Sequence, residues 1–140
     1  MPTATLSPSK GEAARRRILD VALKLFRQKG YAATRVEDVC AEAGLTKGGF
    51  FHHFAGKEDL AVASAEHWSA VTGGFFAGAP YHAHADPYDR LLGYIDFRKA
   101  ILQGGTDEFT CLAGTLAQEA HLSSPAIRDA AGASIFGHAG

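Results

Sequence analysis

The sequence has only two cysteines, Cys40 and Cys111, and they lie far apart in the chain. Two distant cysteines do not favour a disulfide-based scaffold. The chain has no apolar run near the roughly 18 residues that a membrane-spanning helix needs. Its polar start, MPTATLSPSKGEAARRR, lacks the apolar segment of a secretory signal. We therefore expect a cytoplasmic protein with no membrane partner.

Sequence signatures of enzymes are also missing. The chain contains no nucleophile elbow, P-loop or dinucleotide-binding fingerprint, and its GGFF and AGAP segments are not phosphate-binding loops. His82 and His84 in YHAHAD are two residues apart in an expected loop, with no further ligands at a spacing typical of a metal site. We expect no enzyme activity, no cofactor and no bound metal.

The whole chain has almost no excess of either charge, since its net charge is −1. Its first 60 residues and the remainder, however, each carry an excess of one sign. Residues 1–60 hold ten Lys/Arg and seven Asp/Glu, a net charge of +3, while the remainder holds four and eight, a net charge of −4. A basic front on an acidic body favours a polyanionic partner for the front. A solvated charged face would look similar, so this observation needs support from a motif.

The first part of the chain predicts four helices. Ile18, Leu19, Ala22, Leu25 and Phe26 form one apolar stripe at helical spacing, and Gly30 ends that helix. Thr34 precedes Glu37 by three residues, the spacing of a capping box. The expected helices cover about residues 12–29, 36–43, 47–54 and 57–72, after a disordered tail over residues 1–11.

A short helix, a turn containing Gly44 and a second short helix form the pattern of a helix-turn-helix. The second helix of that motif enters the major groove of DNA with its N-terminal residues against the base edges. In LTKGGFFHHF, Gly48 and Gly49 would let the backbone approach DNA, while Phe50 and Phe54 would anchor the helix in a core. The alternative is a glycine-rich loop whose aromatic residues fill a core.

The segment AARRRILDVALKLFRQKGYAATRVEDVCAEAGLTKGGFFHHFAGKEDL resembles the N-terminal DNA-binding domain of the tetracycline-repressor (TetR) family of bacterial transcription regulators. The segments CLAGTLAQEA and SPAIRD are similar to helices of the family's ligand-binding domain. The resemblance implies an all-α protein, with a three-helix helix-turn-helix domain over residues 12–58. An incomplete α-helical ligand-binding and dimerisation domain would follow over residues 59–140.

The resemblance also implies which residues face DNA. Thr34 and Arg35 would approach a phosphate, and Lys57 would contact the DNA backbone. The family usually has Tyr at the position of Phe51, so a hydroxyl contact to DNA is lost while ring packing remains. The full expected DNA-binding set is Thr34, Arg35, Thr46, Lys47, Gly48, Gly49, Phe51, His52 and Lys57.

In the second part of the chain, Asp86-Pro87 predicts one helix start and Ser124-Pro125 another, with a helix over about residues 109–122 between them. The ending ASIFGHAG has no clear helical stripe. The resemblance implies that these helices enclose a small-molecule pocket, although aromatic residues at helical spacing are more often core. The candidate pocket residues are His67, Trp68, Phe75, Phe76, Tyr94, Phe97, Cys111 and Thr115.

The resulting hypothesis is a ligand-responsive regulator, a repressor released from a pseudo-palindromic double-stranded DNA operator by an unknown small molecule. The family forms homodimers through C-terminal helices, and the chain ends at Gly140 before their usual continuation. We therefore expect much of the dimer-forming surface to be missing. The alternative is a dimerisation-defective small-molecule-binding fragment with little specific DNA binding.

Overall fold

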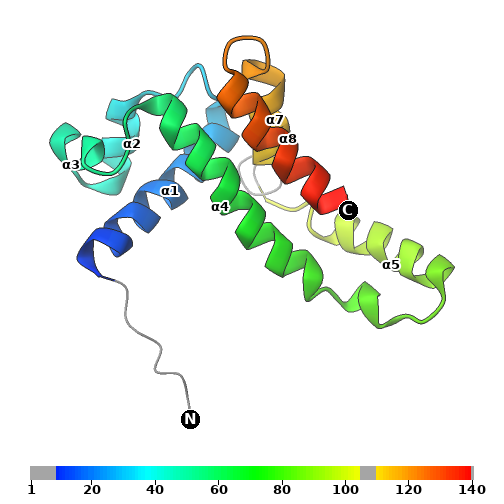
Figure 1. Ribbon diagram of the computed structural model, residues 1–140. Coiled ribbons are helices and arrows are strands. Elements are labelled where there is room, and N and C mark those ends of the chain that lie inside the picture. The colour runs from blue at the N-terminus through cyan, green and yellow to red at the C-terminus, as the bar shows by residue number, and fades with distance from the viewer. Residues whose placement is uncertain (1–8, 105–109, 140) are drawn as a thin grey trace.

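The computed structural model describes residues 9–104 and 110–139, and this part of the chain forms helices without any strand. The predicted all-α class is therefore confirmed. Figure 1 shows how the elements follow one another along the chain. Their order is α1 (Lys10–Lys29), α2 (Val36–Ala43), α3 (Lys47–Phe51), α4 (Lys57–Ala77), the 3₁₀ helix η1 (Pro80–Ala83), α5 (Pro87–Ala100), α7 (Leu112–Ala120) and α8 (Pro125–Ala139).

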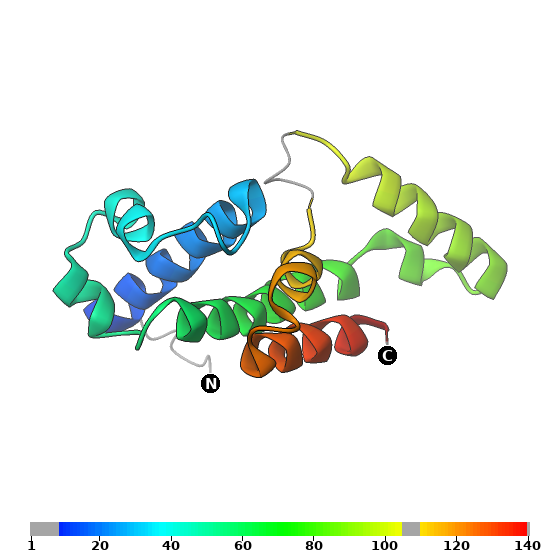
Figure 2. The same ribbon diagram turned by 90° about the horizontal axis from the view of Figure 1, so that it is seen from above.

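The helix α4 connects the two ends of the molecule. In both views, α2 and α3 lie at one end and α5 lies at the other (Figures 1 and 2). The helix α1 packs against α2 and the first part of α4, while α8 packs along α4 and against α7. The helix α7 also contacts α1, so the C-terminal helices touch the N-terminal three-helix unit directly.

One hydrophobic core runs through both halves of the protein. The predicted stripe of α1 is buried in it, with Ile18 and Phe26 fully inaccessible to solvent. Phe50 of α3, Leu116 of α7 and Ile127 of α8 belong to the same contiguous cluster. Full burial of one such side chain stabilises a fold by about 1.5–3 kcal/mol. The N-terminal unit is thus stabilised partly by side chains from more than 80 positions further along the chain.

The helix α1 begins at Lys10, two residues earlier than predicted, because Ser9 caps it. The Ser9 hydroxyl accepts a hydrogen bond from the backbone N–H of Glu12 at 3.1 Å. Residues 1–8 of the expected tail lie outside the described residues. Gly30 ends the helix as predicted, with φ +83°, and its N–H donates to the carbonyl of Phe26.

Two other helix boundaries differ from the prediction. The helix α3 ends at Phe51 rather than Phe54, and α4 continues through Gly73-Gly74 to Ala77 instead of ending near Thr72. Glycine inside a helix costs about 1 kcal/mol relative to alanine, but packing can offset that cost. The rings of Phe75 and Phe97 lie 5.2 Å apart between centroids, which joins the last turns of α4 to α5.

The C-terminal segment is helical where no helical stripe was evident. The helix α8 extends from Pro125 to Ala139, and the hydroxyl of Ser124 caps it by accepting from the N–H of Ile127 at 3.2 Å. Ile127, Ala131 and Ser134 are buried, and the small residues at two of these positions make the stripe hard to recognise. The helix α5 begins at Pro87 as predicted, with Asp86 as its cap. The helix α7 begins at Leu112; Phe109, its predicted start, lies outside the described residues.

Candidate nucleic-acid interface and ligand cavity

The helices α2 and α3 are joined by a tight turn whose geometry requires glycine. Gly44 has φ +69° and ψ +41°, the left-handed region that costs other residues about 1–2 kcal/mol. The N–H of Leu45 then donates to the carbonyl of Cys40 at 3.0 Å and closes the turn. The predicted helix-turn-helix is therefore present, and α3 is its second helix.

The helix α3 presents an exposed tip on a buried anchor. Phe50 is fully buried, and its ring centroid lies 5.7 Å from that of Phe54. The hydroxyl of Thr46 caps the helix by accepting from the N–H of Gly49 at 3.1 Å. A Cβ added at Gly49 would meet Thr46 Oγ1 at 3.5 Å, which is ordinary contact. Packing within the described part of the chain therefore does not require glycine at this position.

Lys47 is held at this tip by a carboxylate. Its Nζ lies 2.8 Å from Oε1 of Glu37 on α2, and both side chains are more than half exposed. The hydrogen bond from Lys47 lowers the pKa of Glu37, and the Glu37 carboxylate raises the pKa of Lys47. A DNA phosphate would compete with Glu37 for the ammonium of Lys47. Arg35, Gly48, Phe51 and His52 are also exposed.

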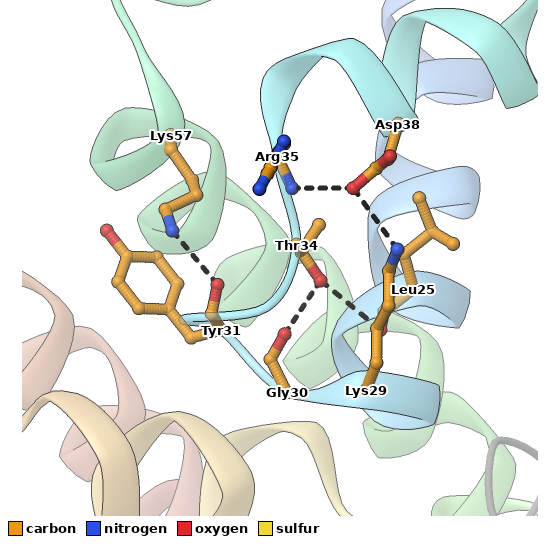
Figure 3. A network of polar contacts seen from close by, with 8 residues as sticks. All are labelled: Leu25, Lys29, Gly30, Tyr31, Thr34, Arg35, Asp38 and Lys57. Atoms are coloured by element: carbon orange, nitrogen blue, oxygen red, sulfur yellow. Dashed lines mark hydrogen bonds and ion pairs between the residues drawn. The ribbon is translucent and has the colours of Figure 1, made fainter.

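Thr34 is buried, contrary to the expectation that it approaches a phosphate. Its hydroxyl donates to the carbonyl of Gly30 at 2.7 Å, as Figure 3 shows. The predicted capping box between Thr34 and Glu37 is therefore not formed. Instead, the Asp38 carboxylate accepts from the N–H of Arg35 at 3.0 Å, one residue later in register. This hydrogen bond and one from Lys29 at 3.1 Å lower the pKa of Asp38.

Lys57, another expected DNA contact, is bound to the turn after α1. Its Nζ donates to the carbonyl of Tyr31 at 3.0 Å and lies 4.2 Å from the centroid of the Tyr31 ring (Figure 3). The N–H of Tyr31 donates to the carboxylate of Glu119 on α7. Burial, followed by the nearby charge of Glu58, raises the pKa of Tyr31. Residues from α4, α7 and the end of α1 therefore meet around Tyr31.

A cavity of 420 Å³ lies among α1, α4, α5, α7 and α8. Of the predicted pocket residues, Trp68, Phe75, Phe76 and Cys111 line it. The other lining residues were not predicted from the sequence. These are Arg27, Val71, Thr72, Arg98, Ile101, Leu102, Ala113, Ser134 and Ile135.

Four predicted pocket residues lie outside this lining. His67 is bound to Asp20 of α1, with Nε2 and Oδ1 3.1 Å apart. The hydroxyl of Thr115 donates to the carbonyl of Cys111 at 3.1 Å within α7. Tyr94 and Phe97 pack against Phe76, with ring centroids 6.4 and 5.5 Å away. They support the cavity wall rather than form its surface.

The missed lining residues carried little local signal. Arg27 belongs to α1, which the sequence placed in the DNA-binding unit rather than around a pocket. Ser134 and Ile135 lie in the segment where no helical stripe was recognised. The position of Arg98, one residue after Phe97 on a predicted helix, gave the only hint that a charged side chain accompanies the aromatic residues.

Other kinds of site find no support in the described ranges. Within residues 9–104 and 110–139, no three His, Cys, Asp or Glu side chains gather as metal ligands would. In the same residues, no helix combines the length and apolar character needed to cross a membrane. Cys40 and Cys111 are free thiols, and burial raises the pKa of Cys40.

Comparison with known proteins places the tip within a recognised domain. Residues 18–63 match the family model described as bacterial regulatory proteins, tetR family. This range contains α2, α3 and parts of α1 and α4. It ends before Trp68, so apart from Arg27 it contains no residue of the cavity lining.

Three related proteins illustrate the extent of the similarity. The HTH-type transcriptional regulator YerO of Bacillus subtilis is 37% identical over 56 residues, which are 40% of this chain and 19% of YerO. The regulator LmrA of the same organism is 29% identical over 125 residues, or 84% of this chain and 62% of LmrA. A TetR transcriptional regulator from Chloroflexus aurantiacus is 30% identical with a TM-score of 0.76, over 91% of this chain and 64% of that structure. The chain thus spans less than two thirds of each of these proteins, whose names are those of regulators rather than enzymes.

Proposed function

The chain belongs to the TetR family of bacterial regulatory proteins, and we propose that it is a cytoplasmic, ligand-responsive DNA-binding regulator of transcription. The observation that carries this proposal is the exposed tip of α3, which is held by the buried ring of Phe50 and has glycines that packing does not require. Such a tip suits the major groove, which admits an α-helix with its N-terminal residues toward the bases.

On DNA, we place α3 in the major groove, with Thr46, Lys47, Gly48 and Gly49 nearest the bases. Arg35 and His52 contact phosphates on either side, and the Phe51 ring packs against the DNA backbone. The fourth basic contact, Lys57, requires the ammonium to exchange the Tyr31 carbonyl for a phosphate. Because these contacts are largely to phosphates, affinity falls steeply as salt concentration rises.

Regulation follows from the position of the cavity. Its lining includes Arg27 of α1 and Trp68 of α4, which belong to the two helices that flank the DNA-reading motif. A ligand that fits one arrangement of these helices better than another shifts the population between them. The direction we propose is repression, with release from the operator when ligand binds.

We propose a homodimer on a pseudo-palindromic operator as the form that binds DNA. Two linked reading heads bind more tightly than one because the second contact becomes intramolecular. In such dimers the two-fold symmetry of the protein is mirrored in the site, with half-sites about one helical turn of DNA apart. In domain terms, residues 12–58 read DNA and residues 59–140 respond to the ligand.

The cavity also supports a second candidate function, a small-molecule-binding protein with little specific DNA binding. It is favoured by the shortage of base-reading side chains at the tip, where Gly48 and Gly49 follow a lysine that is paired with Glu37. The two functions differ in one property, the enrichment of a DNA sequence.

The test is selection of bound fragments from sheared genomic DNA at near-physiological salt, followed by sequencing. Enrichment of a two-fold-symmetric motif supports the regulator, and Lys47→Ala should abolish the enrichment without changing helix content. Lys99→Ala, on exposed α5 and remote from the tip, is the matched control. Salt-sensitive binding without any enriched motif would favour the second candidate.

A further inference from the structure

The chemistry of the cavity indicates what kind of ligand it takes. We infer that the ligand is an organic anion with a flat apolar body, whose charged group binds at Arg98. This inference rests on the proposed function only in treating the cavity as the ligand site. It adds the class of ligand, which neither the family match nor the names of the relatives indicate.

The cavity walls suit a flat apolar body. Trp68, Phe75 and Phe76 of α4 form an aromatic part of the lining, and Ile101 after α5 and Ile135 of α8 add aliphatic side chains to it. A cavity of 420 Å³ lies within the range of about 300–1,000 Å³ typical of small-molecule sites. Stacking against aromatic rings favours planar ligands over branched ones.

The ionisable groups of the cavity favour negative charge. Among the described lining residues there are two arginines and one cysteine, and no Asp or Glu. Arg98 has its guanidinium 5.4 Å from the centroid of Phe76 and 5.9 Å from that of Tyr94, with no carboxylate at ion-pair distance in the described part of the chain. A guanidinium on an aromatic surface presents its edge N–H groups as a planar fork that fits a carboxylate or sulfonate.

Arg27 is a second arginine of the lining and is contributed by α1. Its Nε donates to the carbonyl of Thr110 at 2.8 Å, and its guanidinium lies 4.8 Å from the centroid of Trp68. These contacts fix the arginine in the wall.

Aromatic walls alone would also suit a cationic ligand, which binds over ring faces. Here the guanidinium groups of Arg27 and Arg98 already lie over the rings of Trp68 and Phe76, so a cationic ligand would have to compete with them for these rings. A neutral ligand would bind more weakly than its anionic counterpart, because the N–H groups of Arg98 would form no charge-assisted hydrogen bond with it.

The test uses two probes that differ in one group. The anion 1-anilinonaphthalene-8-sulfonate and the neutral N-phenyl-1-naphthylamine share the same aromatic body, but only the first carries a sulfonate. Trp68 is the only tryptophan of the chain and lies in the cavity wall. Energy transfer from Trp68 to either probe therefore reports binding near the cavity, and the Arg98 variants test whether the bound probe lies in it. Both titrations are carried out on the full chain without DNA.

We expect Arg98→Gln to weaken binding of the anionic probe about tenfold and to change binding of the neutral probe less than about twofold, since a hydrogen bond to a charged group is lost only for the first. Lys99→Gln removes the same charge from the next position of α5, outside the lining, and should alter neither affinity. Far-ultraviolet circular dichroism confirms that each variant is folded.

Equal losses for the two probes, or no loss for either, would overturn the inference, as would the absence of energy transfer from Trp68 in the unmodified protein. If Arg98→Gln does not fold, Arg98→Lys decides. If the Arg98→Lys protein still binds the anionic probe more tightly than the neutral probe, the inference is supported. If it binds the two probes with equal affinity, the inference is overturned. Because DNA is absent, failure here leaves the fragment selection unaffected, and failure of that selection leaves this result standing.

Discussion

Replacing Gly30 with alanine tests the contact between the N-terminal unit and α7. Gly30 has φ +83° and ψ 176°, a combination adopted almost only by glycine. A Cβ at this position would collide with the carboxylate of Glu119, which accepts the hydrogen bond from the Tyr31 N–H. Gly30→Ala therefore strains the backbone and also displaces Glu119 from Tyr31.

The two costs can be separated in a double-mutant cycle. Backbone strain in this region costs about 1–3 kcal/mol, and we take about 2 kcal/mol. Loss of the exposed hydrogen bond from Tyr31 to Glu119 costs about 1 kcal/mol. Gly30→Ala should then destabilise by about 3 kcal/mol and Glu119→Ala by about 1 kcal/mol. The double variant should lose about 3 kcal/mol rather than 4, because that bond is already broken in Gly30→Ala.

Urea denaturation of the four proteins at one protein concentration measures these values. The loss of unfolding free energy in the double variant should be about 1 kcal/mol smaller than the sum of the losses in the two single variants. For independent sites, the double variant usually deviates from that sum by only about 0.3–0.5 kcal/mol. Simple additivity would refute the reasoning, because Glu119 would then make no energetic contact with the end of α1.

Three other predictions concern the helix-turn-helix. Phe50→Ala removes the fully buried anchor of α3 and should cost about 3–5 kcal/mol in urea denaturation; a loss below about 1 kcal/mol would contradict the burial. Glu37→Gln frees Lys47 from its ion pair and should raise the affinity for DNA at low salt. Lys47→Ala should lower the slope of log affinity against log salt concentration by about one. Opposite changes in a fluorescence-anisotropy titration would disprove the competition between Glu37 and a DNA phosphate for Lys47. The pKa of Asp38 is lowered from its ordinary value of 3.8, so its contribution to stability is present above that value and lost as the pH falls through the lower folded-state pKa. Stability measured against pH should show this loss, and Asp38→Asn should remove it.

Local patterns were enough to predict the parts of the fold that depend on near neighbours. The apolar stripe of α1, the glycine that ends it and the glycine turn before α3 all follow from residue preferences within one or two helical turns. The burial of Phe50 follows from its spacing to Phe54. These features also supplied most of the family resemblance, so the helix-turn-helix could be predicted before the structure was known.

Features that depend on competition between local hydrogen bonds, or on distant residues, could not be predicted. Thr34 matched a capping box by spacing, but its hydroxyl donates to the carbonyl of Gly30, and Asp38 takes the capping position instead. Arg27 reads as a surface residue of α1 until α4 and α7 are placed beside it. In α8, alanine and serine at buried positions carry almost no hydrophobic signal, although the close approach of α4 and α7 excludes solvent from them.

The contiguous core has a consequence for protein engineering. Hybrid regulators are made by joining the reading head of one protein to the sensor of another, which presumes that the two parts are interchangeable modules. Here a junction after residue 58 would place foreign side chains against Leu116 and Ile127, which share one core with Ile18 and Phe26. Such a junction would also remove Tyr31, whose backbone N–H donates to the carboxylate of Glu119. A functional hybrid would therefore have to carry over the facing surfaces of α1 and α7 together, as a single inherited unit.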